Sequence, residues 1–79
     1  MMREKQFCII LTFSATTDAM AMEAYCHENG VAGRLIPVPS VISAGCGMCW
    51  RAPVEQRESV EHAIRAAGLR HEGIYEMLI

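Results

Sequence analysis

QFCIILTFSATTDAMAMEAYCHENG, residues 6–30, changes its hydrophobic period near the middle, and this change decides the fold. Residues 6–13 are a nearly unbroken apolar run rich in β-branched and aromatic side chains, which is typical of a strand in the middle of a sheet. In residues 14–30, Ala19, Met22 and Cys26 follow the spacing i, i+3, i+7, which indicates a helix with one apolar stripe. The segment therefore predicts a buried strand followed by a helix that packs against it.

Both ends of this helix carry the residues that usually mark helix ends. Ser14, Thr16 and Thr17 offer alternative N-caps, and Asp18 falls in the first turn. Gly30 is expected to end the helix, because glycine readily adopts the left-handed conformation found there.

The next segments alternate between extended and irregular patterns. Residues 33–39 (GRLIPVP) predict a second strand, and Pro37 and Pro39 favour a sheet edge or an early end because proline cannot donate a ladder hydrogen bond. Residues 40–47 form the longest irregular segment, and residues 47–52 (GMCWRA) resume an extended pattern.

The last third of the chain predicts a second helix and a last strand. Pro53 suits the first helical position, and Gly68 suits the end of the helix. Glu61 and Arg65 would form an i, i+4 ion pair on its exposed side. Residues 71–79 supply the final strand, and the apolar stripe of the helix consists of Val60, Ala63, Ile64 and Ala67.

The order strand, helix, strand, strand, helix, strand predicts an α+β domain with the ferredoxin-like split βαβ arrangement, βαββαβ. In this fold a four-stranded antiparallel sheet carries two helices on one face, and the whole chain, residues 1–79, is one domain. Both faces of the first strand are apolar, since Ile9 and Leu11 alternate with Cys8 and Ile10. A second apolar face suggests a homo-oligomer or a docking surface.

Composition excludes several classes of function. The chain has 79 residues, about half of them apolar, and a formal net charge of −2, so it lacks the basic footprint of a nucleic-acid-binding protein. No apolar run approaches the roughly 18 residues that span a membrane. The N-terminal MMREKQFCIILTF is basic and then apolar, but its apolar run is short and is better interpreted as the first strand than as a signal peptide. We therefore expect a cytoplasmic protein.

Four cysteines make thiol chemistry the main functional question. Cys8 and Cys26 lie in apolar patterns and are expected to be packing residues. Cys46 and Cys49, in SAGCGMCWR (43–51), allow three interpretations: a metal site, a dithiol pair, or a single working thiol. Because the cytosol keeps thiols reduced, a structural disulfide is the least expected role there.

Metal and dithiol chemistry are the weaker interpretations. A structural zinc site needs four ligands, but the chain has one C-x2-C pair and scattered histidines, so we expect no metal and no cofactor; a two-thiolate Cu(I) site stays open. If residues 46–49 were extended, their Cα atoms would lie about 10 Å apart. A disulfide needs less than about 7 Å, which only a turn at Gly47 would provide. Alternation also directs Cys49 to the face opposite Trp50. The histidines are His27, His62 and His71.

A single working thiol is the third interpretation. Cys46 stands between Gly45 and Gly47 in a loop between strands, where glycine permits backbone conformations that gather N–H groups around an anion. Arg34 and Arg51, on the strands that flank this loop, could add positive charge. The alternative is that Cys46 merely occupies a tight turn.

Several stretches resemble a family of small bacterial domains described as selenium/sulfur carrier-like. RLIPVPSVISAGCGMCWR (34–51) is similar to its signature, in which a strand ending in LIP-x-P leads through (I/L)S-x-x-CG into the next strand. EGIYEM (72–77) resembles its closing strand, and Gly30 ends the first helix as in the family. The opening of that helix resembles F-S-x-x-x-D-A-x-A-x-E through Phe13, Ser14, Asp18, Ala19, Ala21 and Glu23.

The resemblance implies a carrier more than a self-contained enzyme. Cys46 would receive sulfur or selenium as a persulfide or perselenide, with Ser43 and Gly47 as the serine and glycine of the motif. Cys49 falls where the family has a varied, often apolar residue, so it is either a resolving thiol or a strand residue. The implied partners are a chalcogen donor such as a cysteine desulfurase and an acceptor enzyme.

Two other classes of function stay open at this point. The chain could be a non-catalytic interaction domain that binds a partner through its sheet face or its PVPSVIS loop, with structural cysteines. It could also be a dithiol redox or soft-metal protein, which requires Cys46 and Cys49 to act together.

Overall fold

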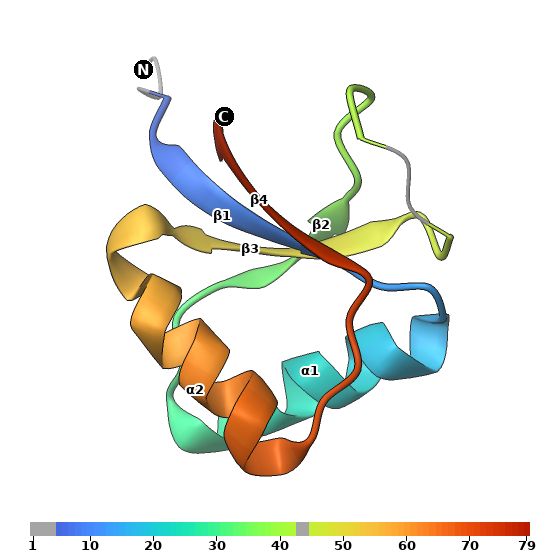
Figure 1. Ribbon diagram of the computed structural model, residues 1–79, viewed down its shortest axis with the longest axis vertical. Helices are drawn as coiled ribbons and strands as arrows, with labels where there is room; N and C mark the ends of the chain where they lie inside the picture. The colour runs from blue at the N-terminus through green and yellow to red at the C-terminus, as the bar shows by residue number, and fades with distance from the viewer. Residues whose placement is uncertain (1–4, 43–44) are drawn as a thin grey trace.

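A computed structural model describes residues 5–42 and 45–79, which form an antiparallel sheet with two helices on one face (Figure 1). The strand order is β2-β3-β1-β4, and every neighbouring pair is antiparallel. The predicted ferredoxin-like βαββαβ arrangement is confirmed. The elements are β1 (Phe7–Thr12), α1 (Thr16–Asn29), β2 (Arg34–Pro37), β3 (Met48–Pro53), a 3-10 turn (Val54–Gln56), α2 (Arg57–Ala67) and β4 (Gly73–Leu78).

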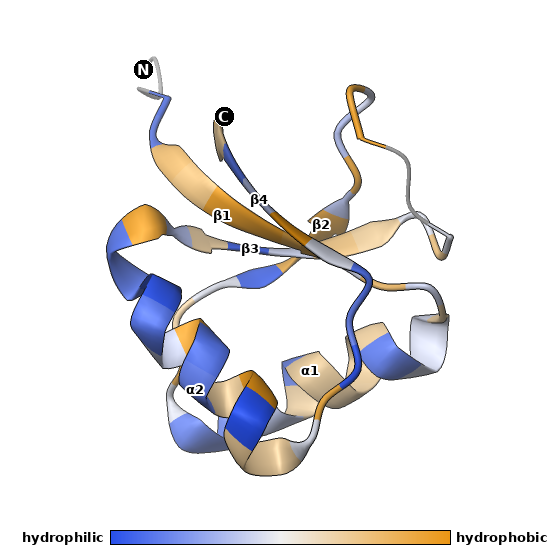
Figure 2. Cartoon of the chain, in the orientation of Figure 1, coloured by the Kyte–Doolittle hydropathy of each residue, from blue (hydrophilic) through white to orange (hydrophobic). Residues whose placement is uncertain are grey.

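Strand β1 is the centre of the sheet, as its apolar run predicts. It pairs with β3 on one side and β4 on the other, and residues 8–13 are buried. Figure 2 shows hydrophobic colour along most of β1, whereas α2 is largely hydrophilic on its outer side. The main core lies between the sheet and the helices and consists of Ile9, Leu11, Phe13, Ala19, Met22, Cys26, Trp50, Ala52 and Val60.

Strand β2 lies at a sheet edge, which confirms the prediction from its prolines. It covers Arg34–Pro37, so it is shorter than the expected range 33–39. Pro37 and Pro39 have no N–H to extend the ladder. One further backbone hydrogen bond, from Val38 N to Gly47 O at 3.0 Å, closes the neck of the β2–β3 connection.

The start of α1 differs from the expectation. The N-cap is Ala15, with an extended backbone and no side-chain cap, so the prediction of a Ser14, Thr16 or Thr17 cap is wrong. The backbone N–H groups of Asp18 and Ala19 both donate to the Ala15 carbonyl. The preceding residues instead contact the β2–β3 connection, a tertiary contact that local sequence does not reveal.

The second helix also begins later than expected. Pro53 is the last residue of β3, opposite Cys8, and a 3-10 turn separates it from α2. Among the described side chains, Glu61 pairs with Arg57 at 3.1 Å and not with Arg65. Arg57 also bonds Glu76 of β4, so its charge ties α2 to the sheet.

The helix-free face of the sheet follows from the strand register. Cys8, Ile10 and Thr12 of β1 point to this face, and all three are fully buried in the single chain. Their neighbours on the same face are Arg34, Ile36, Cys49, Arg51, Pro53, Gly73, Tyr75 and Met77.

Within the described residues, no helix has both the length and the apolar character needed to cross a bilayer.

Candidate functional site

Cys46 lies near the end of the connection between β2 and β3. The connection contains a turn in which Ile42 N donates to Pro39 O at 2.9 Å, and its neck is closed by the Val38–Gly47 hydrogen bond. Ser43, the serine of the predicted motif, lies outside the described residues. Gly47 has a φ of 78° and bends the chain between Cys46 and the first residue of β3.

The β1–α1 connection is the platform on which Cys46 rests. The ends of β1 and β2 and the start of β3 lie at the same end of an antiparallel sheet, so the two connections meet there. The backbone N–H of Cys46 donates to Phe13 O at 3.4 Å. Sequence reasoning missed this role of Phe13 and Ser14, although the topology it predicted already places the two loops at one end.

Gly45 allows the close approach of the two connections. A Cβ atom at this position would lie 2.9 Å from the backbone oxygen of Ser14, closer than real Cβ contacts come. Any other residue at position 45 would therefore push the loop away from the start of α1. The predicted place of Gly45 beside the thiol has a steric reason in the structure.

Cys46 is the most accessible of the four cysteines, all of which lie in the described residues. It is partly exposed and packs along one side against the main core. Its Sγ donates to the Met48 carbonyl at 3.4 Å. Cys8, Cys26 and Cys49 are at most 1% exposed, which agrees with the packing role expected for the first two.

Cys49 lies on the opposite side of the sheet from the main core. It stands in register with Thr12 and Ile36, so alternation directs it away from the Trp50 face, as predicted. Burial, and to a smaller extent the negative charge of a Cys46 thiolate, raises the pKa of the Cys49 thiol to about 11. At neutral pH Cys49 is therefore a protonated, covered thiol, and its part as a resolving thiol stays a prediction.

Arg34 and Arg51 lie together, directly opposite each other on β2 and β3. The strand ends nearest Cys46 are Pro37 and Met48, three positions along the ladder, or about 10 Å away. The guanidinium of Arg51 donates to the carbonyl oxygen of Ile79 at 3.4 Å. The structure thus brings the two arginines to each other and away from the Cys46 loop.

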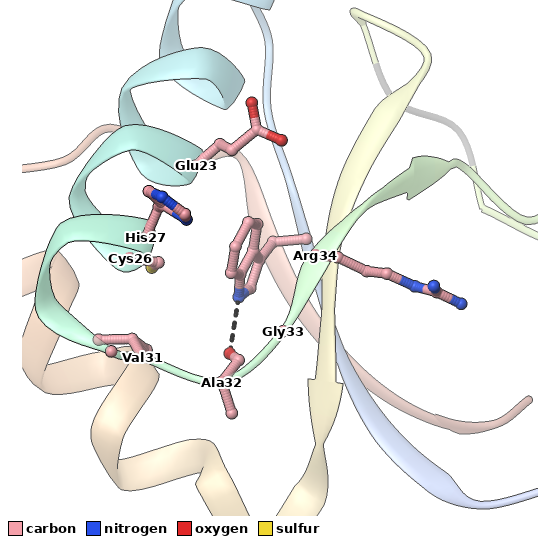
Figure 3. Close-up of a pocket in the computed structure, with 9 residues that line it drawn as sticks. Glu23, Cys26, His27, Val31, Ala32, Gly33 and Arg34 are labelled. Atoms are coloured by element: carbon pink, nitrogen blue, oxygen red, sulfur yellow. Dashed lines mark hydrogen bonds between the residues drawn. The ribbon is translucent and has the colours of Figure 1, made fainter.

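A pocket of about 470 Å³ lies elsewhere, between the C-terminal half of α1 and the start of β2 (Figure 3). Glu23 and His27 stand on its α1 side, and the indole of Trp50 donates to Ala32 O at 3.2 Å along its wall. Cys46 does not line it. Among residues 5–42 and 45–79, no cluster of three or more His, Cys, Asp or Glu side chains could hold a metal ion.

Comparison with known proteins identifies the family. The family model described as "Putative Se/S carrier protein-like" matches residues 8–76, which is nearly the whole chain and includes at least part of every element of the fold. No curated protein and no solved structure matches the chain. The match contains the complete β2–β3 connection with Cys46 and Gly47. The chain therefore belongs to the Se/S carrier protein-like family.

Proposed function

We propose that this protein carries sulfur or selenium on Cys46, as a persulfide or perselenide, and passes the atom to an acceptor protein. The observation that carries the proposal is the contrast among the cysteines: Cys46 alone is partly exposed, whereas the other three are covered. Family membership over residues 8–76 supports a role in carrying selenium or sulfur.

The transfer is a thiol–disulfide type of exchange. The Cys46 thiolate attacks the outer sulfur of a donor persulfide, a bond forms between this sulfur and Sγ, and the donor leaves as a thiolate. In the second step a nucleophile of the acceptor attacks the outer atom, and Cys46 leaves as a thiolate. Each step exchanges one nucleophile for another, so no external oxidant or reductant is needed. A perselenide follows the same two steps.

The proposed partners are a chalcogen donor of the cysteine desulfurase class and an acceptor enzyme. We infer a carrier and not a self-contained enzyme, because the described hydrogen bonds of Cys46 go to backbone carbonyls and supply no acid or base. We expect it to work in the cytoplasm, where thiols stay reduced.

The experiment is intact-mass analysis after incubation with a cysteine desulfurase and cysteine, and then with selenocysteine. Wild type, Cys46→Ser, Cys49→Ser and, as a matched control, Cys26→Ser are compared. We expect wild type, Cys49→Ser and Cys26→Ser to gain one sulfur or selenium atom, and Cys46→Ser to gain none.

Two results would contradict the proposal. A loss of two hydrogens that requires both Cys46 and Cys49 would identify a dithiol redox protein. No adduct on any variant, together with slow alkylation of all four thiols, would leave a non-catalytic interaction domain as the better account.

A further inference from the structure

The helix-free face carries two like charges at directly opposed positions. Arg34 and Arg51 are cross-strand partners, an arrangement that destabilises a sheet unless something else compensates it. Among the described strand positions on this face there is no carboxylate, and the described ion pairs belong to Arg57 on the other side. In a chain of net charge −2, this face is locally basic.

The surroundings of these charges suit a protein interface. Arg34 is exposed, whereas Arg51 is half-buried and already fixed by its bond to Ile79 O. Tyr75 is 43% exposed and shares the face, opposite Ile10. Arginine and tyrosine are among the residues that contribute most binding energy at interfaces. We call this surface the arginine face, formed by Arg34, Ile36, Arg51, Tyr75 and Met77.

The positive charges on the arginine face determine which kind of protein surface is complementary to it. A second copy stacked on the arginine face would set arginines against arginines, and such like-charge juxtapositions are costly at an interface. An acidic surface would instead pair with both guanidinium groups, which bind carboxylates in a bidentate way. The complementary partner is therefore a protein that presents carboxylates flanked by apolar side chains.

We propose that the arginine face docks an acidic surface of the protein that donates the chalcogen to Cys46. This inference rests on the proposed function. A standard interface covers about 800 Å² per partner, a disc of about 16 Å radius. The arginine pair lies about 10 Å along β3 from Met48, so a footprint centred on the pair reaches the end of the sheet from which the Cys46 connection extends. The β2–β3 connection also rises on the side away from the helices (Figure 1).

The test compares a face variant with a charge-matched control. Arg34→Glu/Arg51→Glu changes the arginine face, and Arg65→Glu/Arg70→Glu makes the same change of charge at exposed positions in and after α2. Each is loaded from the cysteine desulfurase persulfide and, separately, from a neutral small-molecule persulfide. The rate of mass gain at Cys46 is followed, and circular dichroism checks that each variant is folded.

We expect loading from the protein donor to fall at least about tenfold in the face variant and less than about twofold in the control. Loading from the small persulfide should be the same in all three proteins. Raising the salt from about 50 mM to about 500 mM should slow wild-type loading from the protein donor and leave the face variant almost unaffected. If the double variant does not fold, Arg34→Glu alone, at the exposed position, gives the same comparison.

The outcomes separate this inference from the proposed function. Equal loading of the face variant and the control by the protein donor would overturn the docking proposal while Cys46 remained the carrier thiol. No loading of wild type by either donor would overturn both. A salt-sensitive dimer, or binding of a single-stranded RNA, that is lost in the face variant would assign the face to another occupant and also overturn the docking proposal.

Discussion

Gly45 sets how closely the Cys46 loop approaches the start of α1. Its hydrogen-only side chain lets the loop rest on Ser14, and this contact holds the Cys46 N–H at the Phe13 carbonyl. At the scale of single residues, the position of the Cys46 thiol thus depends on the absence of a Cβ atom at residue 45. The effect is steric and can be tested by adding one methyl group.

Gly45→Ala should lower the free energy of unfolding by about 1–3 kcal/mol, the usual cost of overpacking. The displaced loop should also expose Cys46, so the rate of its alkylation should rise. Denaturant unfolding and mass-detected alkylation measure the two effects. Gly68→Ala, which strains a left-handed backbone (φ 62°) but places its methyl near no other atom, is the control for destabilisation alone and should leave Cys46 reactivity unchanged. Unchanged reactivity in Gly45→Ala would show that the contact does not hold the thiol in place.

The environment of a single residue could be predicted from the sequence where one short-range rule determines it. Alternation along β3 was enough to direct Cys49 away from Trp50, because side chains in a strand have a period of two. The predictions for the N-cap of α1 and for the ion-pair partner of Glu61 were wrong, because contacts from elsewhere in the fold decide both. The pairing of Arg34 with Arg51 depends on sheet register, which neither arginine reveals by itself.

Among the connecting elements, the α1–β2 connection is held in place by the close approach of Gly33 to β3. Gly33 has a φ of 124°, and a Cβ atom there would lie 2.7 Å from Arg51 O and closer still to the indole of Trp50. The connection thus fits against β3 only with glycine. Sequence placed the strand start within one residue but had no means of seeing this contact.

Gly33→Ala should destabilise the fold by about 2–5 kcal/mol, since it combines backbone strain with a clash. Trp50, the only tryptophan, should lose its bond to Ala32 O, and its fluorescence should shift to the red as water reaches the indole. Denaturant unfolding followed by fluorescence reports both. Ala32→Ser keeps the acceptor carbonyl and should behave like wild type. A Gly33→Ala protein with native emission would refute the expected clash.

The whole molecule keeps buried thiols on both sides of its sheet. Cys26 lies in the main core and Cys49 on the helix-free face, and burial raises the pKa of each thiol from 9.0 to about 11. The unfolded chain releases these protons near pH 9, whereas the folded protein holds them until about pH 11. Their stabilising contribution is therefore complete below pH 9 and is lost as the pH rises through 11.

Stability should accordingly fall between pH 9 and pH 11, by up to about 3 kcal/mol for each thiol. Urea unfolding at about pH 8 and about pH 11 measures this loss. Cys26→Ala/Cys49→Ala should lose less stability over this range than wild type, since other groups titrate equally in both proteins. An equal loss in both would mean that the two thiols do not ionise differently on unfolding.

At this largest scale the sequence predicted most, because the order of elements restricts the topology to few solutions. The central place of β1 and the edge place of β2 followed from an apolar run and two prolines. What could not be predicted is how the connections meet, since Gly33 and Gly45 act through contacts between segments far apart in the chain.

The Cys46 Sγ–Met48 O hydrogen bond has a consequence for the proposed cycle. An empty thiol has a hydrogen on Sγ to donate, whereas a loaded Sγ is bonded to the cargo atom and has none. Loading therefore frees the carbonyl at the first residue of β3, at the Cys46 end of the sheet. The full and the empty carrier would differ in one backbone acceptor as well as in the cargo, so a donor could release the full form and an acceptor could select it.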